Sequence, residues 1–447
     1  MAAPNPDLRE EVVELARDLV RLDTSNSFGT YPGNETLVAR HLAEYLGEAG
    51  IECELVAREE HRANLVARIP GTQSGTAPSL AFVGHTDVVP VDARDWTYPP
   101  FEAVLDDSGY LWGRGVLDMK GEVAARAVAI KELARSGFVP RGDLWFLAVA
   151  DEEDGLADVG MRWLLESRTD IRPDLSINEF DGELFELSDG RRLAAVGIGE
   201  KGTYPVRVTA TGEAGHASVP TLGDNAVPHL GELLVRIGRG LPDPEPHPLV
   251  DQMLEVLLGD AYRPGDDLAT AVAAAGSLHP DFARRLPALA GTTMAPTMLG
   301  GSDKLNVMPS RAWVELDCRI LPGTTEPDVE AAVRGRLGEG IPYELSWPDR
   351  LIAGSASPPD GSVIDAIRAW VADEVPGAGI LPSLGTGFTD SSFLRAIAGT
   401  AAYGFSPFFT TPNEVIVSGY HNADERVHVD DLFASVRFHL HLARELL

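Results

Sequence analysis

The stretch Ser79-Leu-Ala-Phe-Val-Gly-His-Thr-Asp-Val-Val-Pro90 decides how the rest of the chain is interpreted. Its mostly apolar residues from Leu80 to Gly84 predict a strand that is buried on both faces of a sheet. His85 and Asp87 follow at the end of that strand, and residues two positions apart in an extended chain share a face. A carboxylate beside a histidine fixes the ring tautomer, so the pair is suited to holding a metal ion. Alone, the pair is a weak signal, and two hydrogen-bonded residues that close a strand are the favoured interpretation.

Composition restricts the class of protein. The chain has 447 residues, 44% of them hydrophobic, which is enough for two domains. Its net charge is −31, from 37 Lys and Arg against 68 Asp and Glu. This charge repels phosphate groups, so nucleic acid is not an expected partner. No apolar run reaches about 18 residues and no apolar signal core opens the chain, so we expect no membrane partner and a cytoplasmic location. Two cysteines are too few for a disulfide framework.

The order of predicted elements indicates a main domain with a second one inserted. Strands alternate with helices in residues 1–199 and again in 349–447, as in an α/β domain whose mixed sheet lies between two layers of helices. Residues 200–348 are richer in strands and predict a smaller α+β domain inserted between the two halves. Within it, a Pro-rich and then an Ala-rich stretch predict a helical insertion near 241–290.

Three further groups of carboxylates follow predicted strand or turn ends. Asp118 lies in the glycine-rich stretch 113–121, and Glu152 and Glu153 end another buried strand within the charge run 151–154. Four clustered carboxylates repel one another unless a cation is present. Glu179 follows the next short strand, where Asp181 and Glu183 are competing candidates.

A second histidine completes the pattern. His421 lies in a loop before the last predicted helix, with His428 as a rival nearer the start of that helix. Two histidines and three or four carboxylates at strand and loop ends suit a pair of Zn²⁺ ions bridged by one carboxylate. One of two adjacent glutamates can then bind metal while the other faces a water molecule.

These motifs resemble those of a known family. Gly84-His-Thr-Asp-Val-Val-Pro90, Gly113-Arg-Gly-x-x-Asp-Met-Lys-Gly121, Asp151-Glu-Glu-x-Gly155 and His421-x-x-x-Glu425 together resemble a superfamily of co-catalytic zinc hydrolases. It includes aminoacylase, acetylornithine deacetylase, succinyl-diaminopimelate desuccinylase, glutamate carboxypeptidase and carnosine-type dipeptidases. The resemblance spans nearly the whole chain. It implies an enzyme that cleaves an amide or peptide bond next to a free carboxylate in a small substrate, such as an N-acyl amino acid, a dipeptide or a C-terminal residue.

The resemblance also implies a role for each residue. Two Zn²⁺ ions per subunit, replaceable by Co²⁺ or Mn²⁺, would be bridged by Asp118. The remaining metal ligands would be His85 and Glu179 at one ion and Glu153 and His421 at the other. Glu152 would be the general base, and Asp87 would support His85. The family often has a cis peptide after the bridging aspartate, here Asp118-Met119.

In the inserted domain the resemblance implies a lid and a dimer contact. His216, in Gly212-Glu-Ala-Gly-His-Ala-Ser-Val-Pro220, resembles the histidine that stabilises the tetrahedral oxyanion, across the interface of a homodimer in dimeric members. Asn306 and Arg319 resemble positions that bind the substrate carboxylate, for which a planar guanidinium is suited. A simple pair of Arg319 with Asp317 is the alternative. The Gly-rich segment 385–390 departs from the family pattern at Phe388.

Two other classes of function remain open from the sequence. A glycosidase could use Asp/Glu pairs without metal, but it would leave His85 and His421 without a role. A catalytically silent family member could act as a binding module, but it would be expected to lack a ligand or the general base.

Overall fold

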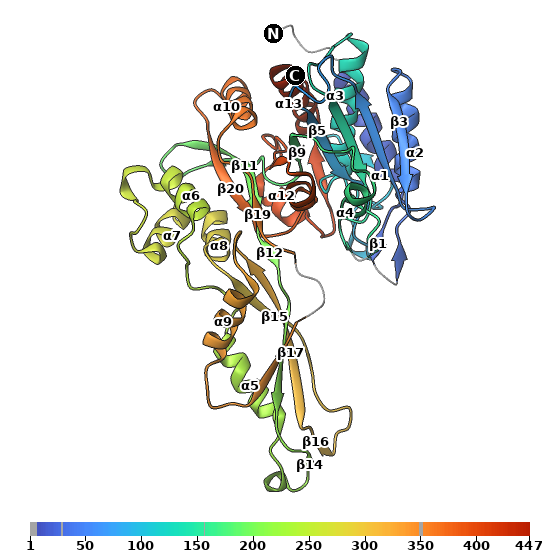
Figure 1. Ribbon diagram of the computed structural model, residues 1–447. Helices are drawn as coiled ribbons and strands as arrows, with labels where there is room; N and C mark the ends of the chain where they lie inside the picture. The colour runs from blue at the N-terminus through green and yellow to red at the C-terminus, as the bar shows by residue number, and fades with distance from the viewer. Residues whose placement is uncertain (1–6, 28–29, 156, 348–351) are drawn as a thin grey trace. The chain divides into compact units, whose positions relative to one another are not determined.

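The computed structural model describes residues 7–27, 30–155, 157–347 and 352–447, which belong to two compact units (Figure 1). Unit 1 comprises residues 1–198, 357–383 and 389–447, and unit 2 comprises residues 199–356 and 384–388. The boundary that we predict between residues 348 and 349 lies outside the described residues.

Unit 1 is built on a large mixed sheet with the strand order β10-β11-β21-β9-β5-β8-β4-β3, and β20 also pairs with β11. The last two residues of β11 pair with β19, and these four residues belong to unit 2. The strand bounds are β3 Glu52–Ala57, β4 Ala63–Ile69, β5 Leu80–His85, β8 Leu144–Val149, β9 Leu175–Asn178, β10 Leu184–Glu186, β11 Arg192–Glu200, β19 Ser355–Ala356, β20 Gly379–Gly385 and β21 Ala401–Gly404.

The centre of this sheet is parallel. β21, β9, β5 and β8 run in the same direction, with Gly404 opposite Asn178 and His85 opposite Val149. β5 and β8 are buried along their whole length, as expected for strands covered on both faces. Because parallel strands end at the same edge of a sheet, the residues after β5, β8 and β9 meet there.

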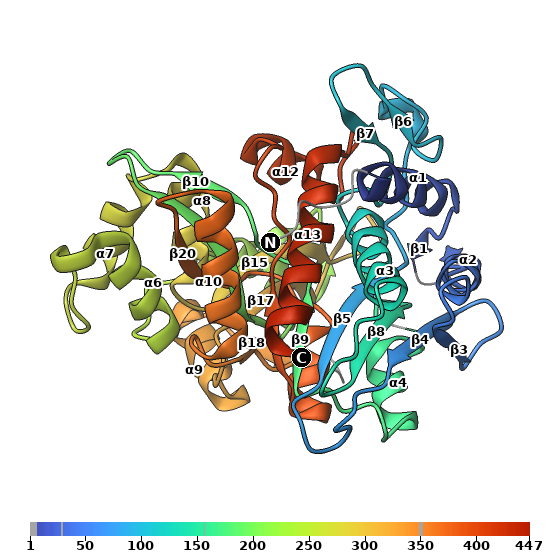
Figure 2. The same cartoon turned by 90° about the horizontal axis from the view of Figure 1, so that it is seen from above.

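Helices cover both faces of the sheet, which confirms the three-layer α/β class (Figure 2). α1 (Asp7–Arg21), α3 (Lys120–Arg135) and α13 (Val429–Leu446) pack against one another, and α3 contacts β5 and β8. On the other face, Ala81, Val83 and Leu147 share a core with Leu164 of α4 and with Leu394. The other helices of this unit are α2 Thr36–Gly47, α4 Met161–Ser167, α10 Ser362–Glu374, α11 Ser391–Phe393 and α12 Asn413–Gly419.

Two small sheets complete unit 1. β1 (Asn26–Ser27) pairs with β2 (Tyr31–Pro32), and β7 (Tyr110–Trp112) pairs with both β6 (Val104–Leu105) and β22 (Arg426–His428). The second of these sheets joins the segment before Asp118 to the segment after His421.

Unit 2 is an α+β fold, as predicted. Its antiparallel sheet contains β12 (Gly202–Thr203), β13 (Val206–Thr211), β15 (Thr293–Gly300), β17 (Arg311–Ile320) and β18 (Tyr343–Ser346). Buried and less buried residues alternate along β17, and its buried residues pack with those of α5 (Ala226–Ile237) and α9 (Glu326–Leu337). β14 (Gly215–His216) and β16 (Val307–Met308) form a separate pair.

The helical insertion of unit 2 contains three helices, α6 (Pro248–Leu258), α7 (Leu268–Gly276) and α8 (Pro280–Leu289). The Ala-rich stretch divides after Gly276 because Pro280 starts a new helix, and the ring of His279 caps it by accepting from the backbone N–H of Asp281. Within the described ranges, no helix is both long and apolar enough to cross a membrane.

Candidate metal centre

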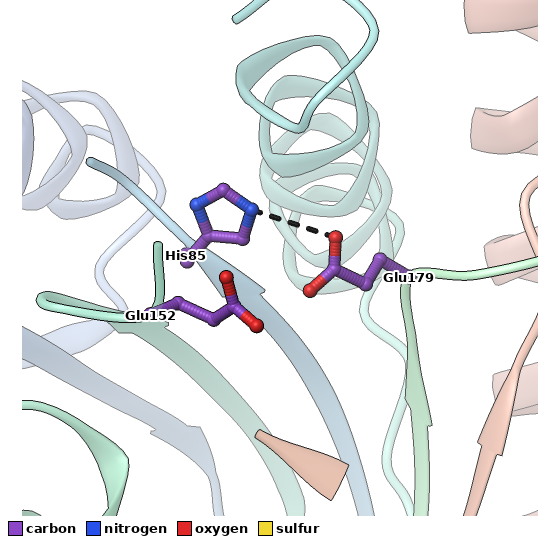
Figure 3. A group of neighbouring side chains, drawn as sticks. All are labelled: His85, Glu152 and Glu179. Carbon is purple, nitrogen blue, oxygen red and sulfur yellow. Dashed lines mark ion pairs between the residues drawn. The ribbon is translucent and has the colours of Figure 1, made fainter. Parts of the chain in front are cut away.

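Three ends of parallel strands bring polar side chains together in unit 1. His85 is the last residue of β5, Glu152 and Glu153 follow β8, and Glu179 follows β9. Figure 3 shows the side chains of His85, Glu152 and Glu179 converging, with one oxygen of Glu179 directed at the His85 ring. The Nε2 atom of His85 lies 3.4 Å from Oε2 of Glu179.

Asp118 lies between the two histidines. Its Oδ1 atom is 3.0 Å from Nε2 of His85, and its Oδ2 atom is 3.2 Å from Nε2 of His421. His421 Nε2 is also 2.9 Å from Oε2 of Glu153. Each oxygen of Asp118 therefore faces a different histidine, and each histidine faces one further glutamate.

The turn that carries Asp118 is tight. The peptide bond between Asp118 and Met119 is cis, as the family resemblance implies. Gly115 has a φ of +87°, and a Cβ there would lie 2.7 Å from Cγ1 of Val88. Only glycine takes this conformation easily at such a close approach.

Negative charge is concentrated in this buried place. Burial raises the pKa of Glu152 well above its ordinary value, and the charge of Glu179 raises it further. Burial and the charge of Asp118 together raise the pKa of Glu153 to about 7. Burial also opposes ionisation of Asp118, but hydrogen bonds from His421 and His85 hold the pKa of Asp118 below its usual range.

The histidines respond in the opposite sense. Burial alone would lower the pKa of His85, but the charge of Glu179 and hydrogen bonds to Asp118 raise it. Hydrogen bonds to Asp118 and Glu153 raise the pKa of His421 to about 10. Both shifts have one cause, a surplus of carboxylates that favours any cation at this position.

The donor set fits divalent metal ions. His85, Glu152 and Glu179 offer ligand atoms that all lie within 4.8 Å of one another, and so do His85, Asp118 and Glu153. The Oε1 atom of Glu153 is buried and, among the described residues, has no hydrogen-bond partner. An orphaned carboxylate oxygen beside imidazole nitrogens is what a metal ion would satisfy. Position alone does not distinguish Glu152 from the expected ligands, because its carboxylate lies as close to their ligand atoms as those atoms lie to one another.

Asp87 holds two strand ends together. The ring Nδ1 of His85 lies 3.0 Å from the main-chain carbonyl oxygen of Asp87 and 3.5 Å from its Oδ1. The carboxylate of Asp87 accepts the backbone N–H groups of Glu152 at 3.2 Å and Glu153 at 3.1 Å. Asp87 therefore orients His85 mainly through its carbonyl group and uses its carboxylate to fix the turn after β8.

Sequence reasoning missed several buried polar residues around the centre. Asn26 donates to Asp87 Oδ2 at 2.9 Å and to Asp151 Oδ1 at 3.3 Å. Arg62 binds Glu35 with two hydrogen bonds of 2.6 and 2.7 Å. These residues are far from the motifs in sequence. Glu425 is a missed residue that does have a sequence signal, because it closes the His421-x-x-x-Glu425 pattern.

The remaining predicted site residues belong to unit 2. His216 is exposed, and its Nδ1 atom accepts from the backbone N–H of Ser218 at 3.2 Å and lies 2.7 Å from the Ser218 hydroxyl. Because a backbone N–H can only donate, the neutral ring carries its proton on Nε2. Arg319 makes two hydrogen bonds to Asp317, at 2.8 and 3.1 Å, and one to Thr203 at 3.1 Å. Asn306 is exposed.

Solved structures of similar fold cover nearly the whole chain. A metallo-carboxypeptidase of the M20 family from Sulfolobus solfataricus aligns with a TM-score of 0.67 and 17% identity, over 98% of this chain and 99% of that one. A di-peptidase, Dug1p, from Saccharomyces cerevisiae aligns with a TM-score of 0.68 and 13% identity, over 98% and 96%. At these identities the likeness concerns the fold.

Sequence comparison gives the family. A probable succinyl-diaminopimelate desuccinylase of Staphylococcus aureus (strain Mu50) is 30% identical over 343 residues, 75% of each chain. A succinyl-diaminopimelate desuccinylase of Rhodospirillum centenum is 28% identical over 438 residues, 96% of this chain and 94% of that one. The model of Peptidase family M20/M25/M40 matches residues 81–445.

Fold, site and sequence therefore agree on the class: this protein is a metal-dependent hydrolase. The chain belongs to Peptidase family M20/M25/M40, and the resemblance drawn from its motifs is confirmed.

Proposed function

We propose that this enzyme hydrolyses an amide or peptide bond next to a free carboxylate, using two metal ions and Glu152 as the general base. One observation carries the proposal. The two oxygens of Asp118 face different histidines, at 3.0 and 3.2 Å, which is the arrangement needed for a carboxylate that bridges two metal ions.

The ligands divide into two sets around Asp118. His85 and Glu179 would hold one ion, and Glu153 and His421 would hold the other. The 3.4 Å and 2.9 Å separations within these pairs support the division. Mixed imidazole and carboxylate ligands suit Zn²⁺, with Mn²⁺ and Co²⁺ as substitutes. Such ions supply Lewis-acid chemistry, which lowers the pKa of water and polarises a carbonyl group.

Glu152 would move the proton. Burial and the charge of Glu179 raise its pKa, and this suits a carboxylate that must both accept and release a proton near neutral pH. In the proposed reaction Glu152 takes a proton from the attacking water and later delivers it to the nitrogen of the leaving amine. The backbone N–H of Glu152 is held by Asp87, so the base is fixed relative to His85.

The substrate would be an N-acyl amino acid, a dipeptide or a C-terminal residue. The relatives named desuccinylases and the neighbours named peptidases support a small amide substrate. We propose that Asn306 and Arg319 bind its carboxylate. Arg319 would have to exchange Asp317 for the substrate, since two of its nitrogens already contact that residue.

We also propose that the protein forms a homodimer through unit 2 and that His216 donates to the oxyanion of the partner's site. The Nε2–H of His216 is available for such a bond because Nδ1 accepts from Ser218. Exposed apolar side chains support the contact: Val235 of α5 is 81% exposed, and Met298 and Leu299 of β15 are 62% and 69% exposed. Among the described strands β15 pairs only with β17, which leaves its outer edge open to a strand of a second copy.

A hydrolysis screen on metal-loaded protein tests the proposed reaction. We expect turnover of some N-acyl amino acids or dipeptides, its loss on chelation, and its recovery with Zn²⁺ or Co²⁺. Amidated versions of the same substrates, which lack the free carboxylate, should be poor. Turnover that resists chelation would contradict the metal-dependent reaction, and equal turnover of amidated substrates would contradict the substrate class.

A further inference from the structure

Glu425 is a fully buried carboxylate to which the proposed reaction gives no role. Its Oε1 atom accepts the backbone N–H groups of Leu117 at 2.8 Å and Asp118 at 3.0 Å. Its Oε2 atom accepts the backbone N–H of Gly115 at 2.9 Å and Nη1 of Arg114 at 2.6 Å. Both oxygens are therefore used to bind the turn that carries Asp118.

The backbone around Glu425 makes the same connection. The N–H of Gly113 donates to the carbonyl oxygen of Glu425 at 3.1 Å, and Nη2 of Arg114 donates to the carbonyl oxygen of Asn422 at 3.1 Å. Arg426, the next residue, begins β22 and pairs with Trp112 at the end of β7. The Asp118 turn follows β7, and the His421 loop precedes β22, the strand that pairs with β7. The side chain of Glu425 joins the turn and the loop a second time, outside this pair of strands.

The His421 loop needs such anchors because of its conformation. His421 has a φ of +57° and Asp424 a φ of +61°, in the left-handed region that non-glycine residues seldom occupy. Surrounding contacts must hold a loop of this kind. Asp424 faces outward, where its carboxylate accepts from the backbone N–H of Thr97 at 2.7 Å and the Thr97 hydroxyl at 2.8 Å. Glu425 faces inward and binds the Asp118 turn.

We propose that Glu425 is a positioning residue for the metal centre, which fixes the Asp118 carboxylate relative to His421 by binding the backbone of the Asp118 turn. This inference rests on the proposed two-metal function, in which Asp118 and His421 share one ion. Asp87 serves the β5 and β8 ends in the same way, because its carboxylate binds the backbone N–H groups of Glu152 and Glu153. The buried carboxylate of Asp87 then fixes the ends of β5 and β8, and the buried carboxylate of Glu425 fixes the Asp118 turn and the His421 loop.

The chemistry explains why the residue is a glutamate. Four donors point at its two oxygens, so all four need an acceptor. A glutamine would keep one acceptor oxygen and turn an NH₂ group toward two of the donors, which repels them. An aspartate would keep the charge but is one methylene shorter, so it could not reach Arg114, Gly115, Leu117 and Asp118 together.

The test measures metal binding, with no substrate. The full-length parent, Glu425→Gln and a control, Glu414→Gln, are stripped of metal and titrated with Zn²⁺ against a chromophoric chelator. Glu414 is exposed in the neighbouring α12, so its variant makes the same chemical change without these contacts. We expect Glu425→Gln to bind one of the two ions about 10- to 100-fold more weakly. Its Co²⁺-loaded absorption spectrum should also change, while Glu414→Gln matches the parent.

Far-UV circular dichroism of the metal-free proteins separates folding from positioning. If Glu425→Gln does not fold, Glu425→Asp takes its place, and it should lose affinity for one ion in the same way. Two results would overturn the inference: parent-like affinities and spectrum in Glu425→Gln, or parent-like binding in Glu425→Asp with weakened binding in Glu425→Gln, which would mean that only the charge matters. A parent that does not bind two ions would instead contradict the proposed function.

Discussion

At the scale of single residues, a substitution of Arg62 measures how much a buried ion pair near the candidate metal centre contributes to stability. Arg62 is 4% exposed and binds Glu35, which is fully buried, and its Nη2 atom lies 3.4 Å from Asp151. Removing one partner of such a pair leaves an uncompensated buried charge. Arg62→Met should lower the free energy of unfolding by about 3–5 kcal/mol, measured by urea denaturation.

A matched surface pair provides the control for this variant. Arg58 and Asp158 have side chains that are 49% and 36% exposed, at a distance of 2.9 Å. Arg58→Met should change stability by less than about 1 kcal/mol. Equal losses in the two variants would mean that the Arg62–Glu35 pair contributes no more than a surface pair.

His439 makes stability depend on pH. It is fully buried in α13, where Arg126 Nε donates to its Nε2 at 3.1 Å and its Nδ1–H donates to the Ser435 carbonyl at 2.7 Å. Burial, and next the positive charge of Arg126, hold the pKa of His439 well below its ordinary value. The unfolded chain therefore binds a proton at this residue that the folded protein excludes, so stability falls as the pH drops below about 6.5.

The expected size of this pH effect follows from the uptake of one proton by the unfolded chain. Between pH 7.5 and 5.5 the parent should lose about 1.4 kcal/mol more stability than His439→Gln, measured by urea denaturation at each pH. The same loss in both proteins would show that His439 takes up its proton in the folded state.

The sequence indicates the residues of the candidate metal centre because they lie in short motifs at strand ends. It does not predict the contacts that hold them. Glu425 accepts hydrogen bonds from the backbone N–H groups of residues 115, 117 and 118. A pattern of side chains in the sequence does not predict such bonds to the backbone. The sequence also leads us to expect that His85 bonds to the carboxylate of Asp87. The local turn decides which group of Asp87 lies nearer, and in the structure it is the main-chain carbonyl oxygen.

At the scale of elements, the junction between the Asp118 turn and α3 leaves no room for a side chain at Gly121. A Cβ there would lie 2.1 Å from the carbonyl oxygen of Val116. Gly121→Ala should therefore shift the turn, destabilise the protein by about 1–3 kcal/mol and weaken metal binding. Thermal melting and a metal titration measure the two effects.

Gly231 in α5 is the control, because a Cβ there meets nothing within 4 Å. Gly231→Ala should stabilise the protein by about 0.5–1 kcal/mol, since alanine restricts the unfolded chain more than glycine does. A Gly121→Ala variant with the stability and metal affinity of the parent would contradict the tight junction.

Elements with a strong period are predictable from the sequence, and pairings between distant segments are not. The alternation of buried and less buried residues along β17 is a period of this kind. The pairing of β7 with β22 joins residues more than 300 positions apart, and both strands are too short to show a period. Within the Ala-rich stretch α7 lacks a clear polar face, and Gly276 and Pro280 mark the division into α7 and α8.

At the scale of the whole molecule, the open edge of β15 and its exposed apolar residues lead us to expect a dimer. Leu299→Lys places a charge on this edge and should convert the protein to monomers in sedimentation velocity. Leu105→Lys, at a 41% exposed position in β6, is the control and should leave the dimer intact. Because each chain carries a net charge of −31, added salt should strengthen association. A parent that is monomeric and fully active would remove the role of His216 in a partner's site.

The most direct test of the two-metal reaction compares adjacent glutamates. Metal content, measured by plasma mass spectrometry, and turnover are determined for the parent, Glu152→Ala and Glu153→Ala. With Glu152 as the base, Glu152→Ala should retain the metal content of the parent and lose at least about 10²- to 10⁴-fold in turnover. Glu153→Ala should lose metal. Equal metal loss in the two variants would contradict the division of roles between base and ligand.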